Sequence, residues 1–334
     1  MFADSDPCPC ESGHLVRDCE CKARGFVPPT AETTPPPPIT GLRVSGCYAS
    51  ALNDCRPPLS AEHPLSLGVI EQLSGNANVI GVSGRPWQRD PSKVDLIGLH
   101  NVTKKVLCRR HNSALSQLDG LAVRFVRGYA DAMIHLTQGL AGEFHRLFNG
   151  FDLERWMLKV ICALQFGEAI PGSGNPTPWQ VPLRWLDVLF DKAELPQGAG
   201  LYMAKRPVHR PNGEFMIYTE RSYLRFSAPK IAGLPIVGVR PIKILAGIRI
   251  ALMNLELELY MTRPLNRKDY VYRPRMIRFP DQDLARTAFI HLGWDKHPPT
   301  FAGKLAFRNE FGFSERGARR ALVRKEGLAR KKKK

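Results

Sequence analysis

The chain has 334 residues, of which 43% are hydrophobic, so it is long enough to bury a core of its own. It contains no run of eighteen apolar residues, and no apolar stretch follows its acidic first residues. These features exclude a transmembrane helix and a secretion signal, and they predict a cytoplasmic protein without a membrane partner. The net charge of +17 favours nucleic acid as a partner.

Four of the eight cysteines stand near the start of the chain as two close pairs. A zinc ion binds four thiolates tetrahedrally at about 2.3 Å, so the pairs must converge across a short hairpin, for which Ser12-Gly13 supplies the turn. Clustered cysteines in a reducing compartment are metal ligands more often than disulfides, and unligated thiols are the alternative. The spacing predicts one structural zinc ion held by Cys8, Cys10, Cys19 and Cys21.

The residues Cys-Pro-Cys-Glu-Ser-Gly, followed by a later Cys-x-Cys pair, resemble the SEC-C motif family over residues 8–21. Glu11 stands where that family usually has glycine, and Glu20 separates two cysteines that are usually adjacent. The resemblance implies a zinc knuckle over residues 1–24 that docks to a protein partner. Such a knuckle is not a catalyst, because four sulfur ligands leave no open coordination position.

A proline-rich segment separates this knuckle from the next group of metal-binding residue types. Six prolines lie between Val27 and Thr40. Because proline lacks a backbone N–H, residues 25–40 are predicted to form a stiff extended linker without helix or strand.

A second set of metal-binding residue types follows within residues 41–119. Cys108 and His111 have the C-x-x-H spacing that brings two ligands to one metal at the start of a helix. Cys47 and Cys55 form an earlier pair, which completes a set of three cysteines and one histidine. The pattern therefore predicts a second structural zinc ion.

The same region resembles the HNH family of ββα-metal nucleases over residues 47–119, because an acidic residue and a histidine follow its first ligand pair. The resemblance implies a metal-dependent endonuclease that cleaves phosphodiester bonds in nucleic acid. It assigns His63 as the general base that activates water. It assigns Glu62 and Asn112 as ligands of Mg²⁺ or Mn²⁺.

The alternative is a non-enzymatic, zinc-binding adaptor that docks on nucleic acid, ribosome or protein. In this interpretation His63 is an ordinary loop residue, and Asn112 caps the helix whose apolar periodicity begins at Leu115. The two interpretations differ at His63, which only a nuclease needs beside an open divalent-metal site.

Helical and then strand-like patterns fill residues 120–313. Apolar residues recur at helical spacing from Leu115 to Leu147, interrupted by glycines, and again from Leu153 to Leu164, where Cys162 is a core residue. Short apolar runs predict strands, the last of them half-exposed, at residues 215–219, 222–227, 242–252 and 255–261, and residues 281–292 predict a short helix. The predicted class is α+β, with two small zinc-nucleated modules followed by a helical segment and a mixed α/β C-terminal domain.

The basic excess is concentrated at the end of the chain, in residues 314–334. From Glu315 onward there are ten Lys or Arg residues against two Glu. A tail of this kind attracts phosphate, and a merely solvated tail is the alternative. The predicted contacts to nucleic acid are Arg109, Arg110, Lys331, Lys332, Lys333 and Lys334.

Overall fold

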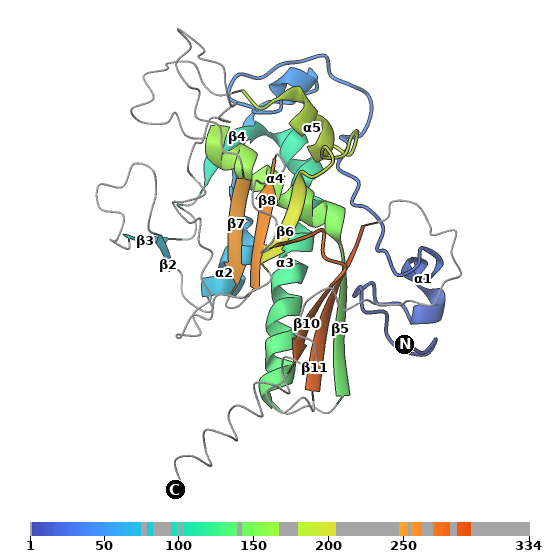
Figure 1. Cartoon of the computed structure of the whole chain (residues 1–334). Coiled ribbons are helices and arrows are strands. Elements are labelled where there is room, and N and C mark those ends of the chain that lie inside the picture. The colour runs from blue at the N-terminus through green and yellow to red at the C-terminus, as the bar shows by residue number, and fades with distance from the viewer. Residues whose placement is uncertain are drawn as a thin grey trace, which may run out of the picture.

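The computed structural model describes residues 2–74, 79–82, 95–98, 101, 103–138, 142–166, 180–204, 247–252, 255–261, 270–280 and 286–294. These residues form both helices and strands, which confirms the α+β class (Figure 1). In this part of the chain, no helix combines the length and apolar character that crossing a membrane requires. The strands predicted at residues 215–219 and 222–227 and the basic tail lie outside the described residues.

Among the described residues, the helical elements are η1 (Val16–Asp18), α1 (Glu20–Ala23), η2 (Ser50–Leu52), α2 (Leu67–Ser74), α3 (Arg109–Gln138), α4 (Gly150–Phe166) and α5 (Leu183–Leu189). The strands are β1 (Leu59–Glu62), β2 (Val79–Val82), β3 (Asp95–Gly98), β4 (Lys104–Cys108), β5 (Gly142–Asn149), β6 (Gly200–Ala204), β7 (Gly247–Leu252), β8 (Leu255–Tyr260), β9 (Tyr270–Tyr272), β10 (Met276–Pro280) and β11 (Arg286–Gly293). They form the ribbons β1-β4 and β2-β3 and two larger sheets with the strand orders β10-β11-β5 and β7-β8-β6-β9.

The long helix α3 forms because apolar residues recur every three or four positions along one stripe, as predicted. Fully buried members of this stripe include Leu115, Leu118, Ala122 and Tyr129. The helix continues through Gly128, where an added Cβ atom would lie 2.9 Å from the ring of Phe148. Glycine therefore allows α3 to pack closely against β5.

The three-stranded sheet differs from the sequence prediction in two places. The helical pattern was expected to reach Leu147, but α3 ends at Gln138 and Leu147 lies in β5. The short helix predicted over residues 281–292 is wrong, because Arg286–Gly293 form β11. This strand pairs in parallel with β5 and antiparallel with β10, so backbone pairing on both sides determines its conformation.

The four-stranded sheet packs against α4, and together they form much of the hydrophobic core (Figure 1). The predicted helix from Leu153 to Leu164 is confirmed, and Cys162 is fully buried within it. The strand predicted at residues 255–261 is also confirmed as β8. It is not half-exposed as expected, because Glu258 is buried and accepts a 2.5 Å hydrogen bond from the Tyr260 hydroxyl.

The proline-rich segment, residues 25–40, contains no helix or strand, as predicted, yet it is bound to the core. Thr33 is fully buried, and its hydroxyl donates to the Leu189 carbonyl oxygen at 2.8 Å. The guanidinium of Arg155 on α4 donates to the Thr33 hydroxyl at 2.9 Å and to the Ala31 carbonyl oxygen at 2.7 Å. We call this segment the proline strap, because hydrogen bonds attach it to α4 and to the end of α5.

A pair of histidines joins β5 and β11. His145 Nδ1 lies 3.0 Å from His291 Nε2, and the two rings stack. Burial lowers the pKa of His291 from 6.5 to about 3. Between these two pH values the unfolded chain binds a proton at His291 that the folded chain does not. The folded state therefore loses stability as the pH falls from 6.5 towards 3.

His291→Phe is expected to make the free energy of unfolding less sensitive to acid. The variant removes this difference of one bound proton between the folded and unfolded states. The slope of the free energy of unfolding against pH should therefore fall by up to about 1.4 kcal/mol per pH unit. Urea unfolding of the zinc-loaded proteins between about pH 6.5 and pH 5 measures this slope, and comparing the two proteins cancels proton uptake by the zinc ligands. Identical slopes in the wild type and the variant would contradict the prediction.

Candidate metal centres and arginine groove

The set of three cysteines and one histidine converges at the junction between β4 and α3, and we call it the junction set. Cys108 ends β4 and His111 lies in the first turn of α3, while Cys47 and Cys55 flank η2. The four ligand atoms lie within 4.8 Å of one another, and all four residues are buried. A strand, a helix and a loop thus bring together the residues that the spacing predicted.

The distances around His111 fit a tetrahedral zinc ion. Nδ1 of His111 lies 3.2 Å from Cys108 Sγ, 3.5 Å from Cys47 Sγ and 3.8 Å from Cys55 Sγ. Zn–S and Zn–N bonds of about 2.3 and 2.0 Å place such atoms about 3.5 Å apart. Burial lowers the pKa of His111 to about 4, so the imidazole stays in the neutral form that binds a metal. With four protein ligands, a zinc ion at this site would be structural.

The four cysteines of the N-terminal knuckle converge as well. The Sγ atoms of Cys8, Cys10, Cys19 and Cys21 lie within 4.8 Å of one another. A hydrogen bond from Cys21 lowers the pKa of Cys10 to about 4, whereas burial raises the pKa of Cys8 to about 12. Within the described ranges, the knuckle set and the junction set are the groups of three or more residues that could hold a metal. Both donor sets suit zinc in composition and spacing.

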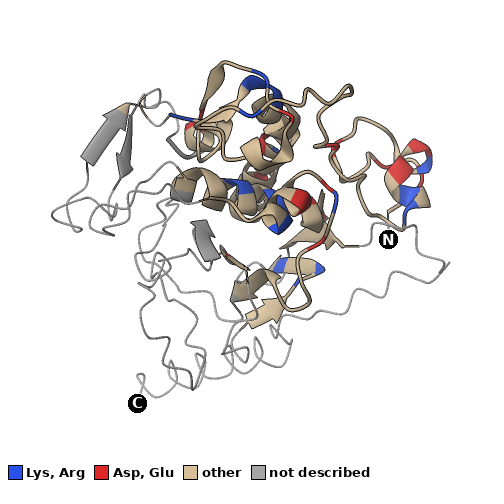
Figure 2. Ribbon diagram, turned by 90° about the horizontal axis from the view of Figure 1, so that it is seen from above, with Lys and Arg blue, Asp and Glu red and all other residues tan. Residues whose placement is uncertain are grey.

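The N-terminal knuckle lies against β5 (Figure 1). The Leu147 N–H of β5 donates to the Pro9 carbonyl oxygen at 2.9 Å, and Arg146 Nε lies 2.7 Å from Glu11 Oε1. Glu11 has a φ of 60°, a left-handed conformation that favours glycine, and the ion pair with Arg146 holds its side chain. Figure 2 shows both signs of charge on α1, so the knuckle does not present a purely basic surface.

The proposed nuclease residues lie around a β1-β4-α3 unit. Strand β1 ends at Glu62 and pairs antiparallel with β4, which leads directly into α3. Asn112 Nδ2 donates to Ser60 Oγ at 3.0 Å and so joins the first turn of α3 to β1. His63 is half-buried and directly follows β1. The helix-cap role considered for Asn112 is wrong, because α3 begins at Arg109 and Asn112 lies inside it.

Glu62 takes part in a buried ionic network. Its side chain is 3% exposed, and Oε1 lies 2.5 Å from Nζ of Lys159 on α4, which is 1% exposed. The same Nζ lies 2.5 Å from Oδ2 of Asp119 on α3. Burial raises the pKa of Glu62, and the positive charge of Lys159 opposes this shift. Sequence reasoning missed Lys159 and Asp119 because no motif contains them.

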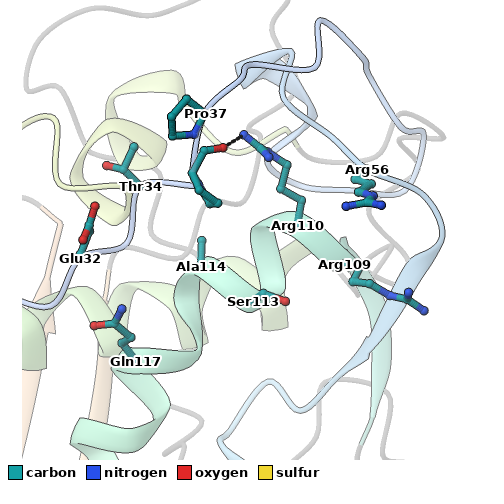
Figure 3. A pocket seen from close by; sticks show the side chains of 10 residues that line it. Glu32, Thr34, Pro37, Arg56, Arg109, Arg110, Ser113, Ala114 and Gln117 are labelled. Carbon is teal, nitrogen blue, oxygen red and sulfur yellow. Dashed lines mark hydrogen bonds between the residues drawn. The ribbon is translucent and has the colours of Figure 1, made fainter.

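A cavity of about 490 Å³ lies at the start of α3 (Figure 3). It runs between the proline strap and the first turns of α3. We call it the arginine groove, because its lining includes Arg56, Arg109 and Arg110, together with Glu32, Thr34 and Gln117.

The three arginines of the groove differ in their contacts. Arg110 Nε lies 2.9 Å from Asp54 Oδ1, and its Nη2 donates to the Pro38 carbonyl oxygen at 3.1 Å, so Arg110 ties the strap to α3. Arg56 and Arg109 are exposed. Figure 3 shows the Arg109 guanidinium pointing away from the strap. Of the predicted basic contacts, Arg109 is therefore available to a partner, whereas Arg110 has partners within the chain.

Comparison of the chain with protein-family models, curated proteins and solved structures finds no match. The grouping of the eight predicted zinc ligands is confirmed by the structure. The predicted contacts of Lys331, Lys332, Lys333 and Lys334 lie outside the described residues.

Proposed function

We propose that this protein docks on nucleic acid through the arginine groove and that its zinc ions are structural. The observation that carries the proposal is the position of Arg109, which directly follows the zinc ligand Cys108 at the start of a 30-residue helix. A closed metal site at this junction fixes the backbone of the first turn of α3, from which the Arg109 side chain extends. The groove is thereby presented on a rigid support.

The chemistry of the groove suits phosphate. A guanidinium offers a planar set of N–H donors that matches phosphate oxygens, and Arg56 and Arg109 are both exposed. The N-terminal end of a helix adds partial positive charge, which favours an anion. Glu32 is the acidic member of the lining and opposes this attraction. The net charge of +17 supplies long-range attraction of the same sign.

Replacing Arg56 and Arg109 together with Gln is expected to weaken nucleic-acid binding and its dependence on salt. Each lost phosphate contact reduces the slope of log K against log salt by about 0.9 for duplex DNA, so the double variant should lose about 1.8. Fluorescence anisotropy with labelled duplex DNA, single-stranded DNA and RNA over a range of salt concentrations measures both effects.

Arg124→Gln is the matched control, because Arg124 is exposed on the same helix and is not part of the groove lining. It should reduce the affinity and the slope much less than the double variant. A wild-type protein that binds none of the three nucleic acids would contradict the proposal. Equal losses in the control and the double variant would contradict the role of the groove.

Cleavage of phosphodiester bonds is the second candidate function, and the arrangement of β1, β4 and α3 favours it. In this case His63 is the base, and Mg²⁺ or Mn²⁺ has to displace Lys159 from Glu62 in order to bind Glu62 and Asn112. Incubation of the zinc-loaded protein with plasmid DNA, single-stranded DNA and RNA, with and without these ions, tests it. Metal-dependent cleavage that is lost in His63→Ala supports a nuclease. If the wild-type protein cleaves none of these substrates, docking remains the proposed function.

The N-terminal knuckle is the proposed site for a protein partner. Its exposed, mixed-charge helix α1 is one surface on which such a partner could bind (Figures 1 and 2). A pull-down with the full chain, compared with a Lys22→Glu variant of this surface, tests this part of the proposal.

A further inference from the structure

Lys159 is a charged side chain placed deep inside the protein. It lies in α4, where every residue from Gly150 to Ala163 is buried, and its own side chain is 1% exposed. Lysine is almost never fully buried unless it is paired. Its Nζ atom lies between Glu62 on β1 and Asp119 on α3, 2.5 Å from an oxygen of each.

The position of Asp119 is held by further hydrogen bonds. Its Oδ1 accepts from the Ser66 hydroxyl, and Ser66 Oγ in turn accepts from Trp156 Nε1 at 2.8 Å. The two carboxylates that face Lys159 come from different elements, and a hydrogen bond from Ser66 holds that of Asp119 in place. The two carboxylates thus form a cation site, and the cation in it is the ammonium group of Lys159.

A divalent ion at Glu62 would compete with this ammonium group. Mg²⁺ binds carboxylate oxygens at about 2.0–2.1 Å and keeps near-octahedral geometry with several waters. The Lys159 Nζ atom already occupies the space next to Glu62 Oε1 and Asp119 Oδ2. A second cation there would meet like charge at short range in a buried environment, where repulsion is weakly screened. The Mg²⁺ expected from the HNH resemblance does not fit beside Glu62 in this arrangement.

We propose that Lys159 is an internal counter-ion that takes the place of a divalent metal between Glu62 and Asp119. The β1-β4-α3 unit then has the layout of a metal-dependent site but is closed to the metal. Glu62 serves to anchor α4 against β1 and α3. This inference does not depend on nucleic-acid binding, because it concerns only which cation Glu62 contacts.

Mn²⁺ binding to the zinc-loaded full chain tests the proposal, with free Mn²⁺ measured by electron paramagnetic resonance. Mn²⁺ binding by the wild type should not depend on Glu62, so the Glu62→Gln variant should bind Mn²⁺ as the wild type does. Lys159→Met, which is similar in size and uncharged, should bind one Mn²⁺ at least tenfold more tightly than the wild type. This site should disappear in the Lys159→Met, Glu62→Gln double variant. Lys105→Met, which removes an exposed lysine from β4, is the matched control and should resemble the wild type.

Two results would overturn the proposal. One is a wild-type Mn²⁺ site that Glu62→Gln weakens tenfold or more, since Lys159 would then not exclude the metal. The other is a folded Lys159→Met variant, verified by circular dichroism, that gains no Mn²⁺ site. If Lys159→Met does not fold, the comparison of the wild type with Glu62→Gln decides the question. Failure of the nucleic-acid binding assay would leave each of these results unaffected.

Discussion

Cys108→Ser is expected to release one of two zinc ions and to lower the free energy of unfolding by roughly 4 kcal/mol or more, one of the few single changes with so large an effect. The serine hydroxyl is a poor zinc ligand, and Cys108 joins β4 to α3 at the centre of the junction set. For a domain of this size such a loss corresponds to a fall in Tm of roughly 10 °C. Zinc content by mass spectrometry and thermal unfolding by circular dichroism measure the two effects.

Cys162→Ser is the control for Cys108→Ser. Cys162 is also fully buried, yet it does not belong to either metal group. The control should keep both zinc ions and should lose less stability, because it introduces a buried hydroxyl without removing a metal. A Cys108→Ser protein that retains two zinc ions and the wild-type Tm would show that the junction set does not bind a structural zinc.

Lys159→Met is expected to destabilise the folded protein by about 3–5 kcal/mol, because it leaves Glu62 as a buried charge without its partner. Adding Glu62→Gln to this variant should recover most of the loss, since no uncompensated charge then remains at Glu62. Asp119 is 28% exposed and can be solvated in the double variant. Urea unfolding of the wild type, both single variants and the double variant gives the coupling energy directly.

A coupling energy near zero would contradict this account of Lys159. It would mean that Glu62 and Lys159 contribute independently, although their charged atoms lie 2.5 Å apart. Lys105→Met again provides the comparison for an exposed lysine and should change the free energy of unfolding by less than about 0.5 kcal/mol. The prediction is thus specific to the buried network.

The two groups of metal-binding residues could be predicted from the sequence because their chemistry depends on short spacings. A thiolate pair separated by one residue, or a C-x-x-H sequence before an apolar helix, restricts the backbone enough to place two ligands together. The helices α3 and α4 were predictable for a similar reason, since their apolar residues repeat at the helical period. Features that depend on residues close together in the sequence can therefore be predicted without the tertiary structure.

The environment of Glu62 could not be predicted in this way. Lys159 lies nearly a hundred residues later, on a helix that was predicted from its apolar residues alone. Asp152, Arg155 and Lys159 lie on another stripe of this helix and contact the proline strap, β1 and α3. Only the tertiary structure shows that α4 is covered on both sides. The same holds for Arg110, whose partners Asp54 and Pro38 have no signature in the sequence.

The hydrogen bonds of the proline strap affect the order in which parts of the chain can fold during synthesis. Thr33 leaves the ribosome 156 residues before its acceptor on Leu189. Until that point the strap has only the part of its site that Asp152 and Arg155 provide. The N-terminal knuckle can bind zinc as soon as Cys21 has been synthesised. The proline strap directly after it cannot make its hydrogen bond to Leu189 until more than half of these 334 residues have been synthesised. The N-terminal knuckle can therefore form before the proline strap that follows it has its complete set of hydrogen-bond partners.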